Sequence, residues 1–323
     1  MKQRSIVLSF VFLCLFLNSA LQAEWKQTEG GGSFKNLLYV NGVLLSGNAA
    51  TIQRSTDFGA SWEEYNTELP EDGHIRDYFV TDGTYLFNMF YGFTYDVLYR
   101  SDDLGRTWKQ ILRKPKETLG RVHGLNGMVV ILDENGAGLH VSTDGGSTWT
   151  FQKGIVVDGK TVKTNLSYIV QLQNAFYAAQ KREGPILVST DGLKTFKSLS
   201  GPKDKEMSLF QAGPFLVVGE GYFDGSANRF RIHTSENGGK SWVTGSVSPT
   251  PEINFLESVV EHKGTLYCTV KGKVCRSRDK GKTWEDISEN LKPHMIEMGC
   301  RLALRGQELG LQACIHFYTR MAD

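Results

Sequence analysis

Short apolar runs recur along this chain, and turn residues or polar connections separate them. One example begins with a run at 75–80, which ends at a turn at 81–83, and continues with a second run at 85–90. A third run at 97–100 leads into a polar motif, and a fourth begins at Trp108. Short apolar runs bounded by turn residues are typical of β-strands. The pattern therefore predicts a unit of four antiparallel strands joined as a meander.

The same unit repeats, and a polar motif, Ser-x-Asp-x-Gly-x-Ser/Thr-aromatic, follows the third run in six of the units. The first serines of these copies are 46, 41, 47, 46 and 42 residues apart. A repeat of about 40 to 50 residues suits four short strands and their turns, and it is typical of radial arrays of small sheets. The copies cover residues 55–62, 101–108, 142–149, 189–196, 235–242 and 277–284.

The motif is suited to a tight turn between two strands. The Asp or Asn oxygen can accept backbone N–H groups, the Gly supplies a positive φ, and the hydroxyls close the remaining bonds. The aromatic residue opens the next strand and buries its ring. Because the fourth copy has Gly192 one place early and Phe196 for Trp, and the fifth has Asn237, these two turns are expected to be the least well tied. The turn residues are Asp57, Asp103, Asp144, Asp191, Asn237 and Asp279, and the aromatic residues are Trp62, Trp108, Trp149, Phe196, Trp242 and Trp284.

With these six copies the chain resembles the Asp-box, or bacterial neuraminidase repeat (BNR), β-propeller superfamily, which includes sialidases, sortilin-type receptors and certain xyloglucanases. The resemblance covers almost the whole chain after residue 23. It implies an all-β fold, a single β-propeller with the Asp boxes at the turn between the third and fourth strands of its blades. Dividing the remaining 300 residues by a period of about 43 predicts seven blades.

The two ends of the chain decide the number of blades. Residues 25–27 match the strand that follows an Asp-box aromatic residue, and residues 296–320 can supply three strands without a box. We expect the N-terminal strand to pair with the C-terminal blade, because this closure removes open sheet edges. The composition of residues 301–311 also suits a helix. Six blades followed by a helical tail are therefore the alternative.

Residues 1–23 have the features of a secretory signal peptide. Lys2 and Arg4 precede an apolar run at 6–17, and small residues follow it. The run is too short for a comfortable membrane span. We therefore expect a cleaved signal, a propeller domain at 24–323, and a secreted or periplasmic protein that is not inserted in a membrane.

Charge and motifs exclude several classes of function. The formal charge of +1 becomes −1 without Lys2 and Arg4, so the chain offers no basic field for nucleic acid or an anionic membrane. No Cys-x-x-Cys or paired-His spacing indicates a metal, and no phosphate-binding loop indicates a nucleotide. No cofactor is expected. We predict a monomer that binds a glycan or an extracytoplasmic protein.

Two cysteines are placed to meet. Cys268 and Cys275 lie symmetrically about Lys271-Gly272, so they would face each other across a hairpin. An exported compartment permits a disulfide, although a directly paired cross-strand site is geometrically demanding. The sequence leaves two alternatives for this pair, a disulfide bond or two free buried thiols.

The expected working surface is the face opposite the Asp boxes. Successive strands alternate in direction, so the boxes share one face, and the longer connections lie on the other. Long loops on a rigid scaffold commonly carry binding residues, and aromatic rings beside charged groups suit sugars or peptides. The stretch 117–123, with Arg121 and His123, is one candidate. The predicted binding residues are His74, Tyr91, Phe93, Tyr95 and Asp96, with loop packing as the alternative for the three rings.

In the sialidases that the chain resembles, three arginines grip the substrate carboxylate, a Tyr activated by a Glu is the nucleophile, and an Asp is the acid/base. Their first arginine lies in a Phe/Tyr-Arg-Ile-Pro segment before the first box, and this chain has no arginine at 30–51. The segment 230–233 imitates it but runs directly into the fifth box. The catalytic candidates are Arg76, Asp77, Arg182, Glu220, Tyr222 and Arg229.

Three functions fit these observations. The leading hypothesis is an exported propeller that binds a ligand or a protein without catalysis. The second is a sialidase-like glycoside hydrolase. The third is an assembly or scaffold factor, because small propellers of this type resemble the assembly factor of photosystem II. The fold alone does not separate them.

Overall fold

A computed structural model of the chain describes thirteen segments. They are residues 24–28, 37–47, 51–66, 73–75, 79–116, 118–163, 166–204, 207–226, 228–247, 255–270, 273–291, 300–313 and 316–322. The predicted signal peptide, Arg76 and Asp77 lie outside them. Strands β1 to β31 and no helix occur in these segments. No helix that could cross a membrane is therefore found in this part of the chain.

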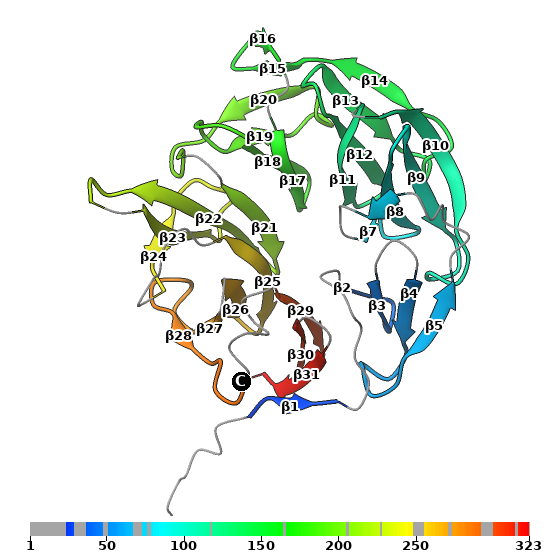
Figure 1. The fold of residues 1–323 in the computed structure, drawn as a ribbon. Coiled ribbons are helices and arrows are strands. Elements are labelled where there is room, and N and C mark those ends of the chain that lie inside the picture. Colours follow the sequence, from blue (N-terminus) through cyan, green and yellow to red (C-terminus); the bar gives the residue numbers. More distant parts are fainter. Residues whose placement is uncertain are drawn as a thin grey trace, which may run out of the picture.

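The strands form seven sheets around a central axis, antiparallel except for one added strand pair, so the chain is a seven-bladed β-propeller (Figure 1). Blade one contains β2 (Leu37–Val40), β3 (Val43–Gly47), β4 (Thr51–Ser55) and β5 (Glu63–Asn66). Blade two contains β6 (Gly73–Ile75), β7 (Val80–Thr81), β8 (Leu86–Gly92), β9 (Tyr95–Ser101) and β10 (Lys109–Pro115). Blade three contains β11 (Leu119–Leu125), β12 (Met128–Asp133), β13 (Gly138–Ser142) and β14 (Thr150–Lys153).

Blade four carries an extra hairpin, whose strand β15 pairs in parallel with β20. It contains β15 (Ile155–Val157), β16 (Lys160–Val162), β17 (Leu166–Leu172), β18 (Ala175–Gln180), β19 (Leu187–Ser189) and β20 (Thr195–Ser198). Blade five contains β21 (Ser208–Ala212), β22 (Phe215–Phe223), β23 (Asn228–Ser235) and β24 (Val243–Gly245). Blade six contains β25 (Leu256–His262), β26 (Thr265–Val270), β27 (Lys273–Ser277) and β28 (Glu285–Asp286).

Blade seven joins the two ends of the chain. It contains β29 (Cys300–Arg305), β30 (Glu308–Ala313), β31 (His316–Met321) and β1 (Lys26–Gln27). Strand β1 pairs with β31 in antiparallel register. The buried Trp25 donates its Nε1–H to the carbonyl oxygen of Ile287, 2.7 Å away. The alternative of a helical tail is wrong, because residues 301–311 place alternate side chains on the two faces of a sheet.

The hydrophobic core is a ring of layers between neighbouring blades rather than one central cluster. One buried cluster fills each of the seven blade interfaces, from blades one and two around to blades seven and one. The first strands β7, β11, β17, β21, β25, β29 and β2 contact one another in that order around the axis. This ring of first strands holds a central channel.

All six Asp boxes lie at the turn between the third and fourth strands of their blades, as predicted. In the third box, the Asp144 carboxylate accepts hydrogen bonds from the Ser142 hydroxyl and from the Thr148 N–H and hydroxyl. Gly146 has a φ of 81°, and the preceding Gly145 also has a positive φ. The residue before the box glycine is left-handed in every box that has this glycine, which the sequence did not indicate.

The fourth and fifth boxes are as well tied as the others, so the expectation of weaker turns is wrong. Asp191 accepts the same three bonds as its counterparts, and Leu193 adopts a φ of 69° where the other boxes have Gly. Asn237 accepts from Ser235 and from the Ser241 N–H, and its amide donates to the Ser241 hydroxyl. The Asn237 side chain keeps the turn geometry of the other boxes, because only its hydrogen bond with the Ser241 hydroxyl runs in the opposite direction.

Candidate binding site

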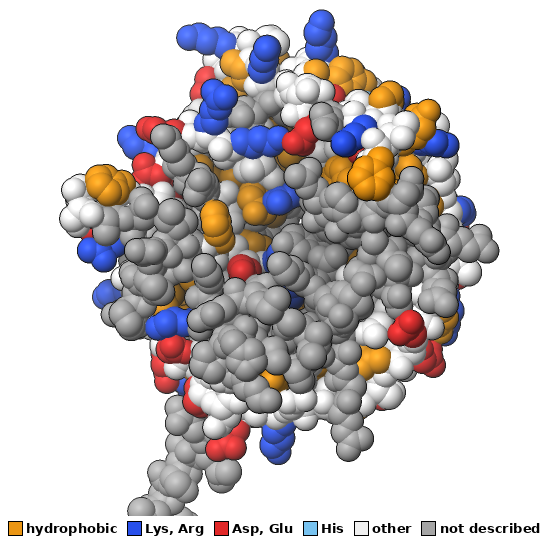
Figure 2. Space-filling view, viewed as in Figure 1, with side chains coloured by type: hydrophobic (Ala, Val, Ile, Leu, Met, Phe, Trp, Pro, Cys, Tyr) orange, Lys and Arg blue, Asp and Glu red, His pale blue; other side chains and the backbone are white. Residues whose placement is uncertain are grey.

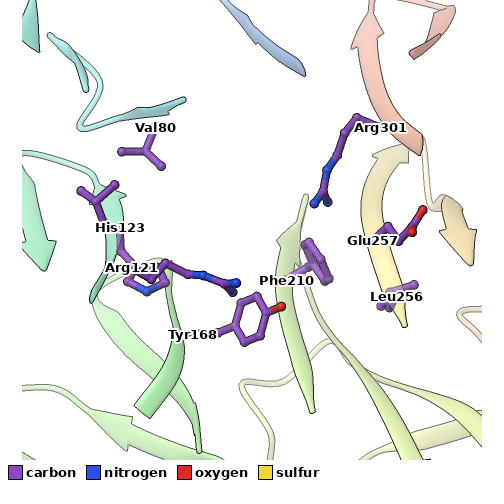
Figure 3. Close-up of a pocket in the computed structure, with 9 residues that line it drawn as sticks. Val80, Arg121, His123, Tyr168, Phe210, Leu256, Glu257 and Arg301 are labelled. Carbon is purple, nitrogen blue, oxygen red and sulfur yellow. The ribbon is translucent and has the colours of Figure 1, made fainter. Parts of the chain in front are cut away.

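A cavity of about 150 Å³ lies in the central channel. Its described walls come from the first strands of six blades, so the ring of blades creates it (Figure 3). The view down the axis shows hydrophobic, basic and acidic side chains in the hollow at the centre (Figure 2). The lining residues are Val80, Arg121, Val122, His123, Tyr168, Phe210, Leu256, Glu257 and Arg301.

One wall combines a guanidinium group with two aromatic rings. The Arg121 guanidinium on β11 lies over the Tyr168 ring on β17, 4.4 Å from its centroid. The centroids of Tyr168 and Phe210, which is on β21, are 6.2 Å apart with the rings tilted by 46°. A cation over an aromatic face is attracted to it, more strongly where water is excluded. These contacts hold the charge of Arg121 at the edge of an apolar surface.

A second arginine enters from the other side of the channel. Arg301 on β29 points toward the centre, as does Arg121 from blade three (Figure 3). Glu257 on β25 turns its carboxylate toward β29, where it accepts a hydrogen bond of 2.9 Å from the Cys300 N–H. Its position is therefore fixed by the backbone that also carries Arg301.

His123 supplies a neutral polar group behind Arg121. Its Nδ1 accepts a hydrogen bond from the Ile169 N–H at 3.5 Å, so its proton is on Nε2. Nε2 is buried and has no hydrogen-bond partner among the described residues. Burial, and then the positive charge of Arg121, lower the pKa of His123 to about 3. The imidazole is therefore uncharged at neutral pH.

This arrangement is suited to binding a negative group beside an apolar one. Two guanidinium groups can form charge-assisted hydrogen bonds with a carboxylate, and the rings of Tyr168 and Phe210 can cover an adjoining hydrocarbon. A retaining or inverting glycosidase generally needs two carboxyl groups on either side of the substrate. Among the described lining residues, Glu257 is the only carboxylate. No group of His, Cys, Asp and Glu that could hold a metal is found in the part of the chain that the structure describes.

Three of the catalytic candidates lie on the second and third strands of blade five. Tyr222 and Arg229 are direct partners across β22 and β23, and the tip of this hairpin projects at the outer rim of the ring (Figure 1). Arg229 donates to the Asp224 carboxylate at 2.6 Å, and the Arg231 guanidinium lies 4.4 Å from the Tyr222 ring centroid. None of these residues lines the cavity.

Glu220 is fully buried and holds a loop to its sheet. It accepts the backbone N–H groups of Lys203 and Asp204 and bonds the side chains of Arg231 and His233. Burial alone would raise the pKa of Glu220, but the hydrogen bonds from His233, Asp204 and Arg231 outweigh burial and lower this pKa to about 2. A carboxylate with this many partners stabilises the blade and is not poised as an acid or base.

Arg182 lies on an exposed loop between β18 and β19. Convergence of three arginines beside a Tyr–Glu pair is therefore not found among the described residues, where the cavity holds only Arg121 and Arg301. The catalytic roles of Arg76 and Asp77 remain a prediction, because these two residues lie outside the described residues.

Four of the five predicted binding residues lie on the β8–β9 hairpin of blade two and divide into two groups. Tyr91 and Asp96 are bound internally: the Tyr91 hydroxyl donates to the Gly120 carbonyl, and Asp96 accepts the Thr118 and Leu119 N–H groups. Phe93 and Tyr95 are exposed by 76% and 40%. His74 is the β6 partner of Tyr91, and its side chain is outside the description. The role of the exposed pair in binding remains a prediction.

Sequence reasoning missed four of the polar and aromatic cavity residues, Tyr168, Phe210, Glu257 and Arg301. Arg121 and His123 were noted only as part of a long connection, although they lie on a first strand. The useful signal was position: each of these residues falls in the first run of its unit, which is the innermost strand of a blade.

Comparisons with known proteins agree with the repeat and the fold. The family described as BNR-Asp box repeat matches residues 98–111. The sequence matches no curated protein. A solved structure described as YCF48 bound to D1 peptide is similar with a TM-score of 0.63 and 14% identity, covering 94% of this chain and 95% of that one.

Two larger proteins contain a similar propeller. The xyloglucanase of family GH74 from Xanthomonas campestris has a TM-score of 0.61 and 15% identity, covering 92% of this chain and 53% of that one. The extracellular domain of a putative hybrid two-component system from B. thetaiotaomicron has a TM-score of 0.65 and 13% identity, covering 93% of this chain and 43% of that one. The six boxes, the seven sheets and these similarities together show that the chain has the fold of an Asp-box β-propeller.

Proposed function

We propose that the protein is a non-catalytic binding module that takes a carboxylate-bearing segment of another protein into its central channel. One observation carries this proposal: Arg121 and Arg301 reach a single aromatic-walled cavity from blades three and seven. Two fixed positive charges in a partly water-excluded recess attract an anion more strongly than the same charges would on an open surface.

The size of the cavity indicates how much of the partner enters. A volume of about 150 Å³ accommodates one side chain or one terminal residue, and ligand pockets for whole small molecules are about 300–1,000 Å³. We therefore infer that an extended segment inserts a single acidic group while the rest of the segment crosses the rim. The exposed Phe255, next to the cavity residue Leu256, can cover part of that segment.

The similar structures support a protein partner, at the level of the fold. One of them is described as bound to a peptide, and another is a xyloglucanase. The cavity favours the peptide alternative, because its described lining offers two arginines and a single carboxylate whose oxygen is already bound to the β29 backbone. The sialidase-like alternative finds less support, because none of the three blade-five candidates lines the cavity.

The test uses fluorescence anisotropy with the chain of residues 24–323. The probe is a labelled nonapeptide containing three glutamates and two leucines, and the comparison peptide has glutamine in place of glutamate. We expect binding of the acidic peptide only, with affinity that falls as salt rises. Arg121→Gln and Arg301→Gln should each weaken it about 10-fold or more.

Arg106→Gln is the matched control, since this exposed arginine lies in the second Asp box on the other face. It should leave the affinity unchanged. Equal binding of the two peptides, or full affinity in the Arg121 and Arg301 variants, would contradict the proposal. Hydrolysis of sialosides or other aryl glycosides by the wild type would contradict the non-catalytic assignment.

Export is part of the proposal and rests on the sequence of residues 1–23. Cleavage after Ala23 would make Trp25 the second residue of the mature chain, where it packs into the interface of blades six and seven. N-terminal sequencing of the protein from its native host should begin at Glu24. Retention of residues 1–23 in the mature protein would contradict cleavage.

A further inference from the structure

Two cysteines of blade six are direct partners in an antiparallel pair of strands. Cys268 on β26 lies opposite Cys275 on β27, and the flanking residues stay in the same register. Directly opposite residues project from the same face of the sheet, with Cα atoms about 4.5–5.5 Å apart. A disulfide needs a Cα separation of about 4.4–6.8 Å. The register thus meets this requirement without a shift of either strand.

Both cysteines are free thiols in the structure, and both are isolated from water. Both residues are 0% exposed and belong to the apolar cluster between blades five and six, and the Cys275 thiol is hydrogen-bonded to Cys268. Burial, together with the neighbouring Cys275, raises the pKa of the Cys268 thiol well above its ordinary value. Because the thiolate is the reactive form, oxidation is slow once the blade has packed and is favoured while the hairpin is still open.

Cys300 is close in space but cannot replace either partner. The Thr269 hydroxyl donates to the Cys300 carbonyl at 3.1 Å, which places Cys300 beside Thr269. Successive residues of a strand point to opposite faces, so Thr269 and Cys268 face different blade interfaces. In agreement, Cys300 belongs to the cluster between blades six and seven.

We propose that Cys268 and Cys275 are an oxidation site, which closes to an intramolecular disulfide as blade six folds. The oxidant is the disulfide form of a thiol–disulfide carrier. One cysteine thiolate attacks the carrier disulfide, forms a mixed disulfide and releases one carrier thiolate. The second cysteine thiolate then attacks the cysteine sulfur of that bond and releases the other carrier thiolate. Two electrons pass to the carrier, which leaves as a dithiol, and the two cysteine protons are released or taken up by it.

This site is independent of the channel. The disulfide would close a short segment, because six residues separate the two cysteines, and segments of this length bring their ends together quickly in an unfolded chain. A bond here constrains the unfolded chain and joins the two central strands of blade six. It would therefore increase stability without touching Arg121 or Arg301.

The test refolds denatured, reduced chain of residues 24–323 with oxidised and reduced glutathione, followed by alkylation under denaturing conditions and trypsin digestion without reductant. Cleavage after Lys271 and Lys273 separates the two cysteines, so a disulfide joins two peptides into one species. We expect this linked species from the wild type and from Cys300→Ser, with a melting temperature several degrees above that of reduced protein.

Cys268→Ser and Cys275→Ser should lack the linked species and show no rise in melting temperature on oxidation. Folded wild type in which both cysteines are alkylated after oxidative refolding would overturn the proposal. Linkage of Cys268 mainly to Cys300 or Cys314 would overturn it as well. The wild-type digest decides the question even if a serine variant does not fold.

Discussion

The Asp-box face and the central channel use polar residues in opposite ways. In each box the polar groups satisfy one another within eight consecutive residues, as Asp144 does with Ser142 and Thr148. In the channel the polar groups come from different blades, and Arg121 and Arg301 are 180 positions apart in the sequence. The hydrogen-bond pattern of the boxes therefore recurs from blade to blade, whereas the arrangement of the channel residues does not.

The repeat therefore specifies the scaffold, and residues at other positions bind the ligand. A box residue is constrained by its own turn and by the preceding blade; for example, the Gly105 backbone packs against Leu45 of blade one. A channel residue is constrained mainly by what it faces across the axis. Substitutions should therefore separate the two faces, with stability lost on one and binding lost on the other.

The largest stability effect is expected from Gly146→Ala in the third box. The added Cβ would sit at a φ of 81° and lie 2.4 Å from Cδ1, the movable end of the Ile111 side chain, so backbone strain with a small packing cost should destabilise the fold by about 2 kcal/mol. Urea unfolding measures the loss. Gly127→Ala, at a φ of 71° with open space around it, is the control and should cost about 1 kcal/mol. Weakened peptide binding by folded Gly146→Ala protein would contradict the separation of stability and binding between the two faces.

A smaller loss of stability is expected from Asp103→Ala in the second box. This carboxylate accepts bonds from the Ser101 hydroxyl and from the Thr107 N–H and hydroxyl. Losing them should cost about 1–2 kcal/mol in urea unfolding. The neighbouring Asp102 forms exposed ion pairs with Arg100 and Lys109, and Asp102→Ala should cost less than about 1 kcal/mol. Equal losses of stability in the two variants would show that the hydrogen bonds of the box stabilise the fold no more than the ion pairs of Asp102 do.

The channel has its own pH dependence through His123. Its folded pKa of about 3 is below its ordinary value of 6.5, so the unfolded chain takes up the proton first as pH falls below 6.5. The neutral imidazole should therefore make the wild type lose about 1 kcal/mol of stability between pH 7.5 and 5.5. His123→Asn keeps an acceptor for the Ile169 N–H without titrating.

This variant should show a flatter stability profile in that pH window, measured by urea unfolding at each pH. The Asp-box carboxylates do not interfere there, because hydrogen bonds from Thr148 and Thr195 lower the pKa values of Asp144 and Asp191 to about 2. Identical profiles for wild type and His123→Asn would contradict the buried neutral state.

The smallest effect is expected from Tyr168→Leu, which removes the ring under Arg121. A cation–aromatic contact at a partly exposed site is worth about 0.5–1 kcal/mol, so affinity for the acidic peptide should fall about threefold. Tyr85→Leu is the matched control, because Arg100 lies over the Tyr85 ring at 4.3 Å near the third box. An equal loss in both variants would place peptide binding outside the channel.

Sequence reasoning succeeded where an interaction is local. It predicted the seven-bladed fold and the position of all six boxes, because a Ser-x-Asp-x-Gly turn is closed by atoms a few residues apart. It erred on the fourth and fifth boxes, because Leu193 tolerates a positive φ and Asn237 replaces the carboxylate bond for bond. The sequence also suggested Glu220 as a catalytic candidate. Its four hydrogen-bond partners lie on β23 and on a loop that only the fold brings near.

The ring of small sheets follows from the amino-acid sequence alone, since each blade is built from neighbouring runs and turns whose contacts join residues close in the chain. The sequence alone did not determine which side chains meet at the axis. That depends on how many blades close the ring and on the angle at which each first strand enters, and these are set by packing in seven interfaces at once. Only the tertiary structure therefore placed Arg121, Tyr168 and Arg301 around one cavity.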